Sequence, residues 1–402
     1  MKSHKNISQR NYMLILLLVG LMTVAYSSIG IYTPAMPAIG KYFGVGNAEV
    51  QFTFSIYIIS FAFGQLIYGP ISDKYGRRPA LIIGLIIYIL GCLLAIFSFS
   101  ISMLIIARAV QAFGGCVGPV VGRAIIRDLY DNDQGAKVLS YVAMVMGAAP
   151  AFAPVIGGYL QVNFNWQSIF ILLFIVALIF LLLNIIYMDE TNKNKQLKPL
   201  SLIKSLNDYL QFLRSPLFLG YTLVASFAMS AIFIYSSGAP FILINLLGVS
   251  PDSYGWYVLI PTLFNIIGAL FASKSIIYFG GERLIFIGAL STMIGGILMV
   301  IYINIFSISV TSIILPMCLI MFGIALLYPS AAQSAVGLFD GKIGSASSLN
   351  SFLHMFIAAI MVLISGYFFG EDEKIMVFFI LLNCIMTLLC VFIIYIGRKT
   401  SA

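Results

Sequence analysis

Hydrophobic residues fall into twelve long runs that short polar segments separate. A membrane-spanning helix needs about 20 predominantly apolar residues, and each run is long enough to cross a bilayer. The runs are continuous and do not alternate with polar residues. They therefore predict helices, because the strands of a membrane barrel alternate. We predict an all-α integral membrane protein with twelve transmembrane helices at 12–33, 50–70, 79–98, 101–126, 138–160, 166–188, 217–237, 254–273, 283–303, 307–329, 345–369 and 375–396.

Composition and charge support this class and add an orientation. Of 402 residues, 61% are hydrophobic and 9% are charged, which excludes a soluble enzyme, a disordered chain and a nucleic-acid binder. Lys and Arg are retained on the cytoplasmic side of a membrane. With a cytoplasmic N-terminus, 19 basic residues lie in cytoplasmic segments and two, Lys41 and Lys374, lie outside. Both termini are therefore predicted in the cytoplasm, and the net charge of +8 reflects topology.

The longest polar segment divides the chain in the middle. It predicts an N-terminal six-helix bundle at 1–188, a cytoplasmic linker at 189–215 and a C-terminal six-helix bundle at 216–402. Transporters built from such repeats place substrate at the interface of the halves, near the bilayer midplane. A weak internal repeat agrees with this plan, because the polar segment between spans 8 and 9 resembles the one between spans 2 and 3 in carrying Gly268, Lys274, Gly280 and Arg283.

The polar segment between spans 2 and 3 reads Gly-Pro-Ile-Ser-Asp-Lys-Tyr-Gly-Arg-Arg-Pro from Gly69. We expect Gly69 to let two helices approach, Asp73 to cap a helix or pair with an arginine, and Gly76 to permit a tight turn. The string resembles the signature loop of the major facilitator superfamily. The resemblance implies the major facilitator fold, and a gating role for Asp73, Arg77 and Arg78.

Span 4 contains a charged residue in the string Arg108-Ala-Val-Gln111-Ala-Phe-Gly114. An arginine inside a membrane costs about 2.5–3.5 kcal/mol on insertion scales unless it faces a cavity or a partner. The string resembles the second motif of the same superfamily, which implies proton handling by Arg108 and positions for Gln111 and Gly114 at a helix interface. The alternative is that Arg108 extends to the membrane surface.

Span 5 carries small residues and two prolines, in a run from Gly147 through Pro150 and Pro154 to Gly157 and Gly158. Such a run lets neighbouring backbones touch and weakens the helix at defined points. Its form resembles the motif of antiporters in the superfamily, which implies export in exchange for another solute.

Two further strings indicate a branch of the superfamily. They begin at Tyr32 (Tyr-Thr-Pro-Ala-Met-Pro) and at Gly122 (Gly-Arg-Ala-Ile-Ile-Arg-Asp-Leu-Tyr, including Arg123 and Asp128), and they resemble the bicyclomycin- and chloramphenicol-resistance (Bcr/CflA) branch. The resemblance implies a proton-driven multidrug exporter of the inner membrane. One departure concerns the coupling ion, since members often carry an acidic residue where this chain has Gly30.

The fourteen acidic residues all fall in loops or at span ends, so a proton carrier has to be sought elsewhere. Asp128 is a candidate proton or gating site, with a structural ion pair as the alternative. His354 lies within a predicted span, and an unperturbed histidine pKa near 6.5 suits proton coupling; the alternative is a packing residue. Tyr32, Asn265 and His354 are candidate proton or substrate contacts. The missing intramembrane carboxylates favour neutral or anionic cargo.

No recognisable catalytic, metal-binding or nucleotide-binding pattern occurs in the sequence. We therefore predict no enzymatic activity, no cofactor, no metal site and no nucleic-acid partner. The expected partners are a small-molecule substrate, protons and the lipid bilayer, and the expected state is a monomer. Export of an endogenous metabolite or siderophore and import of a nutrient stay open, because architecture does not fix cargo or direction.

Overall fold

The computed structural model describes residues 9–130, 138, 151–192, 202–339, 342–368 and 374–399. Regular structure within these ranges is helical, which confirms the all-α prediction. The helices are α1 (Gln9–Gly30), η1 (Thr33–Ala35), α2 (Met36–Phe43), α3 (Asn47–Tyr75), α4 (Arg77–Ile96), α5 (Ile101–Gly115), α6 (Val117–Leu129), α8 (Gln167–Tyr187), α9 (Leu202–Leu213), α10 (Pro216–Pro240), η2 (Phe241–Leu246), α11 (Pro251–Phe306), α12 (Val310–Val336), α13 (Ile343–Phe368) and α14 (Lys374–Lys399). Residues 151–163, ahead of α8, are also helical.

Ten helices among the described residues are long and apolar enough to cross a membrane. One of them, α11, has 56 residues and is interrupted by Gly280, whose φ of 74° and ψ of 160° are not helical. The two parts of α11 therefore correspond to the predicted eighth and ninth spans. The helix at 151–163 is the described end of the predicted fifth span. The count of twelve spans and the cytoplasmic termini stay predictions.

Two predicted spans are not single straight helices. The predicted span at 101–126 consists of α5 and α6, which meet at Cys116. Pro119 has no N–H to donate to the carbonyl of Gly115, so the backbone hydrogen-bond ladder is interrupted there. The predicted span at 12–33 ends earlier, and the chain continues through η1 into α2.

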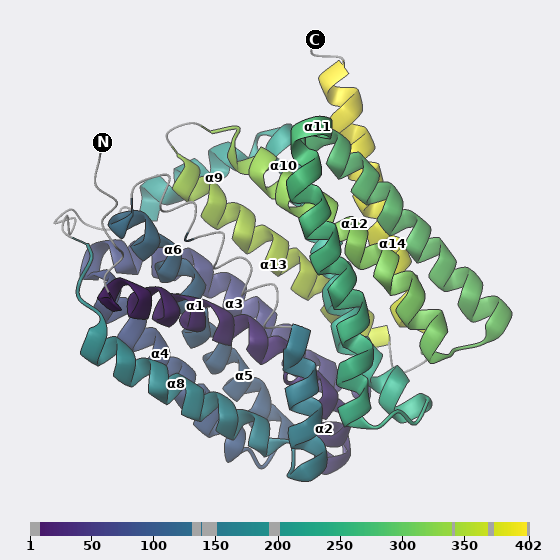
Figure 1. Cartoon of the computed structure of the whole chain (residues 1–402), viewed down its shortest axis with the longest axis horizontal. Helices are drawn as coiled ribbons and strands as arrows, with labels where there is room; N and C mark the ends of the chain where they lie inside the picture. Colours follow the sequence, from purple (N-terminus) through teal and green to yellow (C-terminus); the bar gives the residue numbers. More distant parts are fainter. Residues whose placement is uncertain are drawn as a thin grey trace.

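The helices form two groups that lie side by side (Figure 1). The purple-to-teal group contains α1 to α6 and α8, and the green-to-yellow group contains α11 to α14 together with α10. Helices α3 and α13 pack against each other across the two groups. Toward one end of the molecule η1 and α2 lie beside the start of α11, and toward the opposite end lie α9 and the bend within α11 (Figure 1). We call the end with α2 the outer end and the end with α9 the cytoplasmic end, following the distribution of basic residues.

Candidate functional site

The segment from Gly69 to Arg78 is largely helical, so its prediction as a loop is wrong. Helix α3 continues to Tyr75, α4 begins at Arg77, and Gly76 alone separates them. The φ of Gly76 is 110°, a conformation that L side chains rarely adopt. The close helix approach expected at Gly69 is also wrong, because a Cβ placed there would meet no atom within 4 Å. Gly69 borders a hollow at the cytoplasmic end.

Arg77 links three helices at the cytoplasmic end. Its side chain is 5% exposed, and its Nε donates a hydrogen bond to Asp128 Oδ2 at 2.9 Å. Its Nη1 donates to Ser72 Oγ at 2.8 Å and to a carboxylate oxygen of Asp73. This places Asp128 in an ion pair, which is the structural alternative for that residue. The gating role of Asp73, Arg77 and Arg78 stays a prediction.

The end of α8 completes this charged cluster, and the sequence analysis missed it. Glu190 accepts a hydrogen bond from the Arg77 backbone N–H at 2.9 Å. Arg78 Nη2 donates to the Ile185 carbonyl at 2.7 Å, and Asn192 Nδ2 donates to the Asp73 carbonyl at 2.9 Å. The available signal was the polar Asp-Glu-Thr-Asn string directly after span 6, which the analysis assigned to the linker. Its proximity to span 3 depends on tertiary packing.

Arg108 is fully buried, at 0% exposure, so the alternative that it extends to the membrane surface is wrong. Its guanidinium carbon lies 4.0 Å from the ring centroid of Tyr57 and 4.4 Å from that of Tyr32. Its Nη1 donates to Gln111 Oε1 at 2.6 Å. Aromatic faces attract a desolvated cation by about 2 kcal/mol or more. The aromatic rings therefore replace the carboxylate that a buried arginine usually needs.

Hydrogen bonds hold these components in place. The hydroxyl of Tyr32 lies 2.5 Å from Thr53 Oγ1, and the hydroxyl of Tyr57 donates to the Ala25 carbonyl at 2.8 Å. A Cβ on Gly114 would overlap the backbone of Tyr88, so α4 and α5 make backbone contact beside the arginine. The structure thus brings Tyr32, from one predicted motif, next to Arg108 and Gln111, from another, and it adds Tyr57, which the sequence did not indicate.

The small residues of the predicted fifth span close the outer end. A Cβ on Gly157 would overlap the carbonyl oxygen of Ile31, and a Cβ on Gly158 would overlap that of Pro251, the first residue of α11. A Cβ on Gly255 would likewise overlap the backbone of Val155. The two groups of helices therefore meet here through backbone atoms. Pro154 lies on the same helix, whereas Gly147 and Pro150 lie outside the described residues.

His354 and Asn265 have partners within the C-terminal group. His354 is 5% exposed, and its Nε2 lies 3.1 Å from the hydroxyl of Tyr328, which joins α13 to α12. No described residue bonds its Nδ1. Asn265 Nδ2 donates to the Met321 carbonyl at 3.0 Å and so joins α11 to α12. His354 Nδ1 is therefore buried without a hydrogen-bond partner among the described residues.

A hollow of about 400 Å³, which we call the vestibule, lies at the cytoplasmic end between the two groups. Its walls come from α3, α6, α9 and α13 and from Arg77 of α4. They comprise Gln65, Gly69, Pro70, Ser72, Asp73, Arg77, Val120, Arg123, Ala124, Arg127, Tyr209, Ile343, Gly344, Ser345, Ser347, Ser348 and Ser351. The vestibule therefore combines basic and hydroxyl groups at the interface of the halves.

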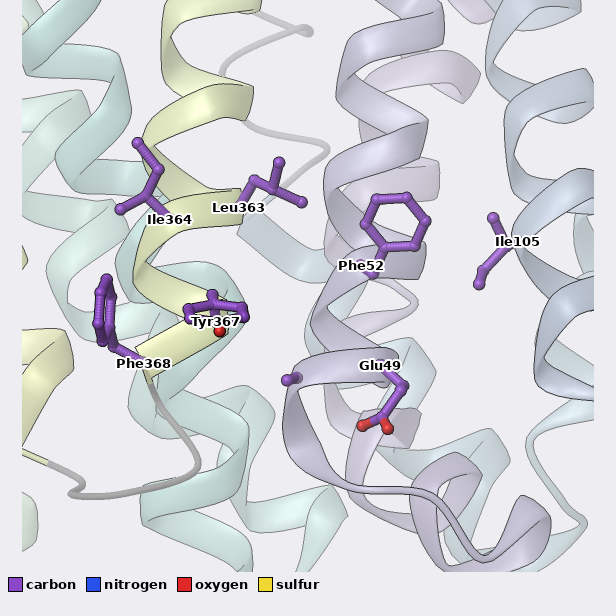
Figure 2. Close-up of a pocket in the computed structure, with 8 residues that line it drawn as sticks. Glu49, Phe52, Ile105, Leu363, Ile364, Tyr367 and Phe368 are labelled. Atoms are coloured by element: carbon purple, nitrogen blue, oxygen red, sulfur yellow. The ribbon is translucent and has the colours of Figure 1, made fainter.

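An apolar groove of about 540 Å³ lies between the same two groups at the outer end. Figure 2 shows Phe52 of α3 and Leu363 of α13 facing each other across it, with Glu49 near one end. Tyr367 is 78% exposed. The groove is thus open and lined by apolar side chains, whereas the vestibule is lined by polar ones.

Comparison with known proteins identifies the family. The sequence model of the Major Facilitator Superfamily matches residues 18–360. The chain belongs to the Major Facilitator Superfamily. Within this superfamily, it is 28% identical to the bicyclomycin resistance protein homolog of Haemophilus influenzae, over 73% of this chain and 74% of that protein. It is 29% identical to multidrug resistance protein D of Escherichia coli, over 85% of each chain. These relatives confirm the predicted resemblance to the Bcr/CflA branch.

Solved structures of superfamily members confirm the fold. The xylose transporter XylE of E. coli, in a partially occluded inward-open conformation, superposes with a TM-score of 0.74 at 13% identity, covering 96% of this chain and 97% of that one. A peptide transporter in complex with sulfate gives a TM-score of 0.77 at 15% identity, covering 96% and 94%. With its apolar helices and multidrug-transporter relatives, this superfamily member is a multi-pass protein of the inner membrane.

Proposed function

We propose that the protein is a secondary active transporter that exports small amphipathic compounds by alternating access. The observation that carries the proposal is the difference between its two ends. At the outer end the backbones meet where Gly158 contacts Pro251 and the groove between α3 and α13 is apolar, while the cytoplasmic end holds the polar vestibule of about 400 Å³. A carrier that takes up cargo from the cytoplasm needs such a state. The moving parts are the proposed bundles at 1–188 and 216–402, joined by the linker at 189–215, in a monomer.

Drug export is supported by the relatives, whose names are bicyclomycin resistance protein homolog and multidrug resistance protein. The span-5 segment supports the direction, because its resemblance to the antiporter motif implies export.

We further propose that export is coupled to proton entry and that His354 carries the proton. Asp128 already pairs with Arg77, while His354 Nδ1 has no hydrogen-bond partner among the described residues and its Nε2 lies 3.1 Å from the Tyr328 hydroxyl.

The transport proposal is tested by accumulation of labelled chloramphenicol, bicyclomycin and a lipophilic cation in efflux-deficient cells, with and without an uncoupler. We expect lower accumulation of at least one compound, abolished by the uncoupler and by Arg108→Ala. Gly69→Ala is the matched control, because its added Cβ meets open space. Unchanged accumulation of all compounds, with the protein correctly inserted, would contradict drug export and favour a metabolite exporter or a nutrient importer.

Coupling is tested in proteoliposomes with an imposed pH gradient. We expect His354→Ala to abolish gradient-driven transport while substrate exchange without a gradient continues. Tyr328→Phe is the matched control, since it removes the hydroxyl and leaves the histidine. Gradient-driven transport by the His354 variant would eliminate this residue as the proton carrier.

A further inference from the structure

The vestibule has a positive charge that its own residues do not neutralise. Three arginines line it, and one of them, Arg77, is bound by Asp73 and Asp128. The Asp73 carboxylate also faces the vestibule, but its side chain is 55% exposed and bonds Arg77. Arg123 and Arg127 form no ion pair with a described residue. A ligand in the vestibule would therefore meet these two guanidinium groups, with the Asp73 carboxylate held by Arg77 beside them.

The local structure of α6 orients Arg123. Its Nε donates to the Pro119 carbonyl at 2.9 Å, which fixes the side chain along the helix. Neither terminal nitrogen has a partner among the described residues. Arg127 follows four residues later, so the two guanidinium groups project from one face of α6. A pair of planar donors is suited to carboxylate and phosphate oxygens.

The opposite wall carries serine hydroxyls that form no hydrogen bond with the described part of their own helix. Serines in a membrane helix commonly bond the carbonyl four residues earlier, as Ser226 and Ser230 of α10 do at 2.7 and 2.8 Å. In the described structure, the vestibule serines of α13 make no such bond. They are Ser345, Ser347, Ser348 and Ser351, in the first three turns of the helix.

Two more donors face the vestibule. Gln65 is 3% exposed, and its Nε2 has no hydrogen-bond partner among the described residues. A buried amide N–H without a partner costs about 1–3 kcal/mol, which a ligand oxygen would recover. Burial raises the pKa of Tyr209, and the neighbouring Asp208 raises it further, so the Tyr209 hydroxyl stays protonated and able to donate.

We infer that the vestibule is a binding subsite for an anionic group, carboxylate, phosphoryl or sulfonate, on the exported compound. Arg123 and Arg127 supply the charge, and Gln65 with the α13 serines supplies neutral donors. Ser347, Ser351 and His354 follow one another at helical spacing on one face of α13, so the subsite leads to the proposed proton carrier. This inference rests on the proposed export function, and it specifies the cargo as anionic amphiphiles.

The inference is tested by equilibrium binding to the purified full chain in phosphatidylcholine nanodiscs. The probes are N-dansylglycine, its methyl ester and dansylethylenediamine, which share a fluorophore and differ in charge. We expect the carboxylate to bind at least tenfold more tightly than the ester or the amine. Arg123→Gln should remove this preference and leave ester binding unchanged. Lys74→Gln is the control, because Lys74 lies near Arg77 in sequence but does not line the vestibule.

Three binding results would contradict the proposed anionic subsite or its assignment to cargo. Equal binding of the three probes, or a charge preference that survives in the Arg123→Gln, Arg127→Gln double variant, would overturn it. Displacement of N-dansylglycine by phosphatidylglycerol added to the discs would overturn the cargo assignment in favour of a lipid headgroup. Because binding is measured without transport, a failed accumulation assay contradicts drug export alone, and failed anion selectivity contradicts the subsite alone.

Discussion

Arg77 on α4 and Asp128 on α6 form an ion pair of 2.9 Å, although 51 residues separate them in the chain. The guanidinium is shared with Asp73, two residues before the end of α3. One buried cation thus fixes three helix ends at the cytoplasmic side. The two carboxylates are not equivalent, since the Asp128 side chain is 21% exposed and that of Asp73 is 55% exposed.

This difference predicts unequal effects of removing the two carboxylates. Asp128→Ala should lower the free energy of unfolding by about 3 kcal/mol, because it deprives a buried charge of its partner. Asp73→Ala should lower it by about 1 kcal/mol or less, since exposed pairs contribute little. The midpoint of thermal unfolding in detergent measures both. Equal shifts would contradict the assignment of Asp128 as the main partner of Arg77.

Alanine substitutions at two glycines with positive φ distinguish two causes of destabilisation, which are backbone strain and steric overlap of the added Cβ. At Gly280, with φ of 74°, an added Cβ meets no atom within 4 Å, so Gly280→Ala should cost about 1–2 kcal/mol from backbone strain alone. At Gly76, an added Cβ would also overlap the Glu190 carboxylate, so Gly76→Ala should cost more. Gly76→Ala combined with Glu190→Ala should approach the Gly280→Ala value. Thermal unfolding of these three variants tests this, with Glu190→Ala alone as the control for the lost hydrogen bond to the Arg77 N–H. No gain from the second substitution, relative to that control, would refute the overlap.

The backbone contact at the outer end predicts that a larger side chain at Gly158 opens that end. Gly158→Val should separate the predicted fifth span from Pro251 and expose the outer face of the interface. A cysteine introduced at Val155, beside Gly255, should then react with a membrane-impermeant maleimide several-fold faster than in the protein with Gly158 intact. Gly69→Ala in the same cysteine background is the control. An unchanged labelling rate would mean that this contact does not hold the outer end shut.

The aromatic faces around Arg108 predict that stability depends more on the ring of Tyr57 than on its hydroxyl. Tyr57→Phe loses the hydrogen bond to Ala25 and keeps the ring, so it should destabilise by about 1 kcal/mol. Tyr57→Leu also loses the ring 4.0 Å from the guanidinium, and it should cost about 2 kcal/mol more. Thermal unfolding and uncoupler-sensitive efflux should both rank the wild-type protein above Tyr57→Phe and Tyr57→Phe above Tyr57→Leu. Equivalent variants would show that cation–π contact does not stabilise Arg108.

The sequence predicted those features that depend on local pattern. Hydropathy located the helices, and the motifs selected Arg108 and Gly158, which lie in a buried site and at the outer closure. It could not predict that α3 continues to Tyr75, because the polar residues there read as a loop while packing against Arg77 keeps them helical. It also missed Tyr57 and Glu190. Their partners lie on other helices, and hydropathy carries no signal for contacts between spans.

The closure at Gly158 is made from uncharged backbone atoms, whereas Arg77, Arg123 and Arg127 lie at the cytoplasmic end. Steric contact between backbones does not weaken with ionic strength, while exposed charges are screened by salt. The permeability barrier toward the outside should therefore be indifferent to the ionic composition of the medium that the cell happens to meet. At the opposite end, the exposed Arg123 and Arg127 should respond to ionic strength.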